Sequence, residues 1–138
     1  MDTERERLLQ TRFAAEAGRL REVRQQVMDA AGRAGLAAEP AAEIALAISE
    51  ACANIIEHGY GGRAGEAIVL TVDREPGRLV FVLEDDAPRI DPAKIVSRDL
   101  ADLRPGGLGV RFMREIMSEV SYLPGPERGN RLELVKEL

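Results

Sequence analysis

Residues 47–60, which read AISEACANIIEHGY, carry most of the information about the fold of this chain. No glycine or proline interrupts the stretch before Gly59, and apolar side chains recur at helical spacing at Ile44, Ile48, Ala51 and Ile55. The pattern predicts an amphipathic helix that starts near Pro40, since proline is tolerated in a first helical turn, and ends at Gly59. An α-helix places Glu50, Asn54 and His58 along one face, because they are spaced four residues apart.

The three polar residues of this helix face have complementary chemistry. A carboxylate can act as a base, an amide oxygen can ligate a metal ion, and an imidazole can support either group through a hydrogen bond. Glutamate and asparagine one turn apart are also common on an ordinary solvated helix face. The segment alone leaves both interpretations open, and the residues downstream have to decide between them.

Composition limits the class of protein. The chain has 138 residues, 45% hydrophobic and 31% charged, with a net charge of -5, so we expect one domain over residues 1–138. The acidic balance argues against direct nucleic-acid binding and against an anionic membrane surface. The N-terminus is densely charged and no apolar stretch approaches the length of a membrane span, so we expect a cytoplasmic protein. Cys52, the only cysteine, is expected to be a small buried hydrophobe.

Periodicity and turn residues predict the remaining elements. In chain order, we expect a strand over 8–13, helices over 16–34 and 39–59, a hairpin of strands 67–72 and 78–83, a helix over 108–119, and strands over 120–123 and 131–136. The polar connection between about 86 and 107 is longer than most loops, which indicates a functional or a mobile segment.

Two further features follow the first helix motif. At Asp85 a hydrophobic strand ends in a carboxylate, which can accept a hydrogen bond from the exocyclic amine of adenine. At residues 106–109, which read GGLG, a loop becomes a helix, and glycines there let backbone N–H groups approach phosphate oxygens. An asparagine oxygen such as that of Asn54 suits Mg²⁺, which keeps most of its shell as water and phosphate. Each feature alone also has an ordinary structural explanation, such as a turn-forming aspartate or a flexible glycine link.

Together these motifs resemble the GHKL ATPases, which have the Bergerat ATP-binding fold, and within them the anti-sigma-factor serine/threonine kinases of the RsbW and SpoIIAB type. The resemblance extends from about Phe13 to Leu138. Residues 49–60 resemble the N-box, Asp85 with 90–92 the adenine-binding box, 107–109 the second glycine box, and 129–132 the terminal strand of the subgroup.

The resemblance implies an α+β fold: a two-layer α/β sandwich with a mixed, mostly antiparallel sheet and helices on one face. It implies that Glu50 is the catalytic base, that Asn54 ligates Mg²⁺ and that His58 has a supporting, structural role. An ATP lid would span about residues 92–107. The ATP contacts that it implies are Asn54, Asp85, Ala87, Arg104, Gly106, Gly107, Leu108, Gly109 and Asn130.

The chain departs from the family pattern at three positions. Ala87 and Arg89 occupy glycine positions of the adenine box, and Asn130 stands where other branches often carry a threonine. The resemblance implies an ATP-dependent protein serine kinase that sequesters a sigma factor and phosphorylates a STAS-domain antagonist. The alternative is a partner-switching module of the same fold that binds ATP without kinase activity. The ATP domain of a sensor histidine kinase is disfavoured, because the only histidine lies inside the N-box.

The predicted helix over 16–34 suggests a partner surface. Its apolar stripe is bordered by basic residues, namely Arg19, Arg21, Arg24 and Arg33. The default interpretation is a solvated face, but a basic patch on an acidic protein would also speed capture of an acidic partner. We therefore expect a homodimer with Arg19, Arg21 or Arg24 near the dimer or partner surface.

Overall fold

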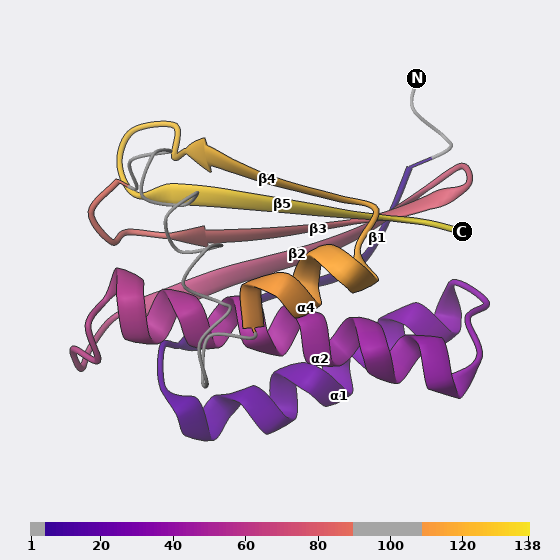
Figure 1. The fold of residues 1–138 in the computed structure, drawn as a ribbon, viewed down its shortest axis with the longest axis horizontal. Coiled ribbons are helices and arrows are strands. Elements are labelled where there is room, and N and C mark those ends of the chain that lie inside the picture. The colour runs from indigo at the N-terminus through magenta and orange to yellow at the C-terminus, as the bar shows by residue number, and fades with distance from the viewer. Residues whose placement is uncertain (1–4, 90–108) are drawn as a thin grey trace.

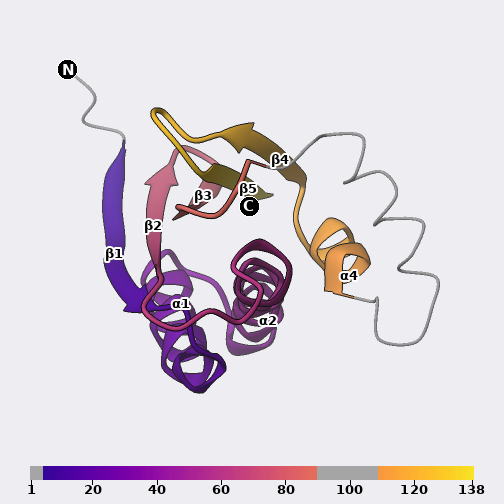
Figure 2. The same ribbon diagram turned by 90° about the vertical axis from the view of Figure 1, so that its left-hand side faces the viewer.

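The sheet and its helices form two layers. In the computed structural model, which describes residues 5–89 and 109–138, five strands are ordered β1-β2-β3-β5-β4, and helices α1, α2 and α4 cover one face (Figures 1 and 2). The strands are β1 (Glu6–Ala14), β2 (Ala67–Glu75), β3 (Arg78–Asp85), β4 (Glu119–Pro124) and β5 (Asn130–Glu137). The helical elements are η1 (Ala17–Arg19), α1 (Leu20–Arg33), α2 (Ala38–Asn54), the π-helical turn η2 (Ile55–Gly59) and α4 (Gly109–Ile116). The predicted α+β sandwich with helices on one face is confirmed.

The sheet differs from the prediction in one respect. Every pairing between the described strands is antiparallel, so the expected mixed sheet is not found in this part of the chain. The reason lies in the connections. A single crossover helix would make β1 and β2 parallel, but the pair α1 and α2 adds one more reversal of chain direction.

Alternation along the strands separates two faces. Ile68, Leu70 and Phe81 are fully buried against the helices, as expected for one face of a half-covered sheet. On the opposite face Val80, Val82 and Val135 form a separate small cluster. Removing apolar surface from water, at roughly 25 cal/mol per Å², is the main stabilisation of both.

The two long helices, α1 and α2, bury the apolar stripes that the sequence predicts. In α1 these are Leu20, Val23 and Val27, and in α2 they are Ile44, Ile48 and Ala51, continued by Ile55 in η2. Cys52 is fully buried as predicted, and burial raises the pKa of its thiol to about 12. α1 ends near Gly35, whose φ of 97° only glycine adopts without strain. No helix among the described residues is long and apolar enough to span a membrane.

The last helix is shorter than predicted. It was expected to reach Glu119, but α4 ends at Ile116 and Glu119 already begins β4. The cause is the sheet, because the backbone N–H of Ser118 donates to the carbonyl of Val135 at 2.8 Å instead of continuing the helix. Met113 and Met117 are buried, as predicted.

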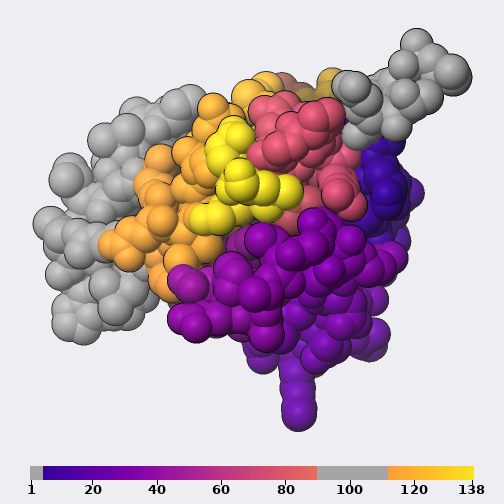
Figure 3. Space-filling view, turned by 90° about the vertical axis from the view of Figure 1, so that its right-hand side faces the viewer, coloured from indigo at the N-terminus to yellow at the C-terminus, as the bar shows by residue number. Residues whose placement is uncertain are grey.

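At the end of the sheet near the β2–β3 turn, a buried aspartate makes ionic contacts with two arginines. Asp73 on β2 is only 2% exposed and accepts hydrogen bonds from the guanidinium groups of Arg5 and Arg7. Burial alone would raise the pKa of Asp73, but the two arginines lower it below its ordinary value. The chain terminus joins the same end, where the N–H of Leu138 donates to the carbonyl of Gly77 at 2.9 Å (Figure 3).

Candidate nucleotide site

Asp85 ends β3 with its carboxylate buried on the helix-covered side. The residue is only 8% exposed. Its Oδ1 accepts hydrogen bonds from the Ala87 backbone N–H at 2.9 Å and from Asn130 Nδ2 at 3.0 Å. Burial raises the pKa of Asp85, while the bonds from Asn130 and Ala87 act in the opposite direction. The backbone N–H of Asn130 is a further donor to this carboxylate. Because the two oxygens of an ionised carboxylate can accept about four hydrogen bonds, capacity remains for a ligand.

The hairpin that β4 and β5 form also fixes the position of Asp85. Asn130 lies opposite Asp85 in the β3–β5 register, and its Nδ2 also donates to the Pro88 carbonyl at 3.0 Å. Gly129 has a φ of 72°, and a Cβ there would lie 1.8 Å from the carbonyl oxygen of Asp85. Only glycine permits this approach. Asn130, predicted as an ATP contact, is thus placed where it orients Asp85 and the loop that follows.

Asn54 is the last residue of α2, and Glu50 lies one turn before it on the same helix. The Nδ2 of Asn54 is buried and has no hydrogen-bond partner among the described residues. Leaving such a donor unpaired costs about 1–3 kcal/mol, and it is rare enough in native proteins to need an explanation. Glu50 is half-buried, so its carboxylate is accessible to a partner from outside the fold.

His58 lies beyond the last residue of α2. After Asn54 the helix widens into the π-helical turn η2, which changes the angle between successive side chains. The His58 side chain is 50% exposed, and its nearest charged neighbour is the Glu57 carboxylate at 3.9 Å. The stacking of His58 on Asn54 and Glu50 therefore stays a prediction.

The two substitutions at glycine positions are accommodated by the fold. Ala87 is buried, and its Cβ lies 3.3 Å from the point where a Cβ would stand on Gly59. The loop after β3 therefore packs directly on the end of η2. Arg89 extends in another direction and donates from Nη2 to the Gly125 carbonyl at 3.1 Å.

Part of the predicted site lies outside the described residues. Arg104, Gly106, Gly107 and Leu108 fall in this part, as does the predicted lid over 92–107. Gly109 is the first residue of α4, one position after the predicted helix start, and α4 packs against α2 (Figure 2). Gly109 therefore begins a helix that packs against α2, the helix that carries Glu50 and Asn54.

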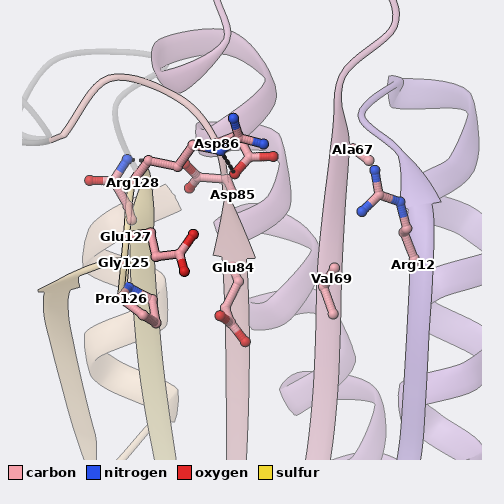
Figure 4. A pocket seen from close by; sticks show the side chains of 11 residues that line it. Arg12, Ala67, Val69, Glu84, Asp85, Asp86, Gly125, Pro126, Glu127 and Arg128 are labelled. Carbon is pink, nitrogen blue, oxygen red and sulfur yellow. Dashed lines mark hydrogen bonds and ion pairs between the residues drawn. The ribbon is translucent and has the colours of Figure 1, made fainter.

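A separate pocket lies on the helix-free face of the sheet. It has a volume of about 340 Å³ and is floored by Ala67 and Val69, with Arg12 and Glu84 at its sides (Figure 4). Asp85 borders this pocket, but Glu50 and Asn54 do not line it. It is not the predicted nucleotide site, which needs both the helix and the end of β3.

Sequence comparison decides the family. Residues 13–136 match the model of the histidine kinase-like ATPase domain, which is most of the chain. The chain belongs to this family. The predicted family resemblance is thus confirmed.

Individual relatives of this histidine kinase-like ATPase come from several bacteria. The chain is 32% identical over 83 residues to the serine/threonine-protein kinase BtrW of Bordetella bronchiseptica, covering 57% of this chain and 58% of that protein. It is 28% identical over 104 residues to an anti-sigma F factor of Clostridium novyi, covering 72% and 73%. It is 25% identical over 128 residues to the serine-protein kinase RsbW of Bacillus thuringiensis, covering 87% and 79%.

Proposed function

We propose that this chain is an ATP- and Mg²⁺-dependent protein serine kinase that also binds a sigma factor and acts in the cytoplasm. Its phosphorylation substrate would be a STAS-domain anti-anti-sigma protein, and binding of one partner would exclude the other. The names of the relatives support the kinase and anti-sigma parts, and the motif resemblance supports the STAS partner. The observation that carries the proposal is the buried, unpaired Nδ2 of Asn54 one turn after Glu50.

The residues at the site fit a nucleotide with its metal. Among the described residues no cluster of histidine, cysteine, aspartate or glutamate side chains could hold a metal ion alone. Mg²⁺ usually retains water and phosphate oxygens and needs few protein ligands, which fits a single amide at Asn54. In this arrangement Asn54 Oδ1 would contact Mg²⁺, and Nδ2 would find its missing acceptor on a phosphate oxygen. When bound, Mg²⁺ supplies neutralisation of the phosphate charge.

The protein side chains divide the remaining tasks. Asp85 Oδ2 accepts a hydrogen bond from the exocyclic amine of adenine, while Oδ1 stays held by Ala87 and Asn130. Glu50 accepts the proton of the substrate serine as the serine oxygen bonds to the γ-phosphorus. The bond from that phosphorus to the bridging oxygen breaks, and ADP leaves. Positioning and charge stabilisation provide most of such a rate enhancement.

The test is phosphorylation of a purified STAS-domain protein from the same genome, followed by mass spectrometry. Glu50→Gln should lower the rate by about 10²–10⁴-fold and leave ATP affinity unchanged, since a general base does not anchor the nucleotide. Glu43→Gln, an exposed position earlier on α2, is the matched control and should retain full activity. Equal activity of Glu50→Gln and wild type would exclude Glu50 as the base. ATP binding without any phosphorylation would favour the non-catalytic module.

We also propose a homodimer, and the structure narrows the residues to test. Arg24 donates to the buried Ser49 hydroxyl at 3.0 Å, and Arg33 donates to the Leu8 carbonyl at 2.6 Å. These two arginines stabilise the fold and are poor choices for a surface test. Arg21 is exposed, so Arg21→Glu should weaken dimer or partner association measured by light scattering and pull-down without changing ATP affinity.

A further inference from the structure

Tyr60 lies between the helix that carries Asn54 and the strand that carries Asp85. The residue is 1% exposed, and its backbone N–H donates to the Ile55 carbonyl at 2.8 Å, which is an i to i−5 bond of the π-helical turn. The wider turn directs the chain away from the axis of α2. Tyr60 consequently packs against the sheet as part of the main core.

The Tyr60 hydroxyl joins two strands at the point where their pairing stops. It donates to the Ala67 carbonyl at 2.6 Å and accepts from the Asp86 backbone N–H at 2.7 Å. The β2–β3 register runs from Glu75–Arg78 to Val69–Glu84 and goes no further. Continued in the same register, it would pair Ala67 with Asp86. The hydroxyl therefore takes the place of a direct strand-to-strand hydrogen bond between these two residues.

The bridge made by the Tyr60 hydroxyl affects Asp85 directly, because Asp85 precedes Asp86 in the chain. One side of the turn after β3 is held by Asn130, which donates to Asp85 Oδ1 and to the Pro88 carbonyl. The other side is held by Tyr60 through Asp86. With both sides of the turn fixed, the backbone that carries the Asp85 carboxylate is held in place.

We propose that Tyr60 is a positioning residue for base recognition: its hydroxyl ends the β2–β3 ladder and orients Asp85 toward the nucleobase. The inference rests on the proposed nucleotide-binding function and extends it to base selectivity. It differs from a plain packing role, because packing depends on the ring of Tyr60 and base recognition on its hydroxyl. Removing the hydroxyl leaves the Asp86 N–H and the Ala67 carbonyl without their partner, so the turn that carries Asp85 loses one of its two anchors.

The experiment compares three ligands with wild type and Tyr60→Phe of the full chain, using calorimetry in the presence of Mg²⁺. The ligands are ATP, GTP and tripolyphosphate, and the last has no base. Tyr60→Phe should weaken ATP binding about tenfold, leave tripolyphosphate binding unchanged and reduce the preference for ATP over GTP. Val80→Ala, which removes buried apolar surface on the helix-free face, controls for lower stability alone and should keep the wild-type preference.

A second measurement covers the case in which Tyr60→Phe folds poorly. Incorporating 3,5-difluorotyrosine at position 60 keeps the ring and weakens the hydroxyl as an acceptor, so it should reduce the ATP preference in the same direction. Amide hydrogen exchange at Asp86 should also become faster. Equal losses for ATP and tripolyphosphate, or an unchanged ATP preference in both variants, would overturn the role of Tyr60. If wild type binds none of the ligands, the proposed function fails instead.

Discussion

Two buried aspartates lie on neighbouring strands at opposite ends of the sheet, and the protein holds them in different ways. Asp73 on β2 receives its hydrogen bonds from two positively charged guanidinium groups, those of Arg5 and Arg7. Asp85 on β3 receives its bonds from neutral donors, the Asn130 amide and the Ala87 backbone N–H. The pKa of Asp73 is lowered and that of Asp85 is raised.

The comparison shows which kind of buried carboxylate indicates a site. Burial alone does not, since both aspartates are buried. A carboxylate neutralised by arginines is fully used by the fold, and it fastens the first strand to the second. A carboxylate with a raised pKa and only neutral hydrogen-bond donors has capacity left for a ligand. Asp85 meets these conditions and Asp73 does not.

The largest effect should come from the backbone contact at Asp85. Gly129→Ala should lower the free energy of unfolding by about 3 kcal/mol or more, because the added methyl group meets the Asp85 carbonyl and φ is positive. Gly77→Ala is the matched control at the opposite end, since its φ is also positive, at 75°, but nothing lies within 4 Å. It should cost about 1 kcal/mol. Urea unfolding measures both; equal costs would show that the hairpin tolerates movement at Asp85.

The arginine-bound aspartate should matter for stability alone. Asp73→Asn should lower the free energy of unfolding by about 1.5 kcal/mol, the low end for a charge-assisted hydrogen bond, since Arg5 and Arg7 are half-exposed. Asp85→Asn should change it by less than about 0.5 kcal/mol without nucleotide, because an amide oxygen can replace Oδ1. A larger loss in Asp85→Asn than in Asp73→Asn would reverse the comparison.

The smallest expected effect concerns pH: the stabilities of Asp73→Asn and Asp85→Asn, each relative to wild type, should change with pH in opposite directions. Asp73, with a lowered pKa, contributes stability above its ordinary value of 3.8, and this is lost as the pH falls through its folded pKa. Asp85 has a raised pKa, so its ionisation costs stability as the pH rises from 3.8 through its folded pKa. Relative to wild type, Asp73→Asn should therefore recover at acid pH, and Asp85→Asn should gain toward neutral pH. Urea midpoints from pH 7 to 3 would show this, and parallel curves would contradict it.

Local patterns predicted most of the fold. The apolar stripes of α1 and α2, the β2–β3 hairpin and the position of Asp85 at a strand end follow from periodicity within a few residues. The strand predicted over 67–72 ends at Val72, and the next residue is an aspartate, a type that is depleted in strands. In the structure the strand continues to Glu75 because Arg5 and Arg7, far away in the chain, neutralise Asp73.

The site was predictable in its residue types but not in its geometry. The motif that ends in Tyr60 was recognised, yet the role of its hydroxyl depends on Ala67 and Asp86, which only the sheet register brings near. Asn130 was expected to contact ATP, which stays a prediction, and in the structure its amide donates to Asp85, 45 residues earlier. The π-helical turn at Ile55–Gly59 had no clear signal, since its residues fit an α-helix equally well.

Calorimetric titration of ATP with Mg²⁺ into wild type, Asp85→Asn and Asp73→Asn tests the central claim most directly, at a temperature where all three are folded. Wild type and Asp73→Asn should bind with the same affinity. Asp85→Asn should bind ATP at least about tenfold more weakly, the loss expected when one hydrogen bond to a charged group is replaced. Tripolyphosphate should bind all three equally. The account is contradicted if wild type binds no ATP at millimolar concentration, or if both substitutions weaken ATP binding to the same extent.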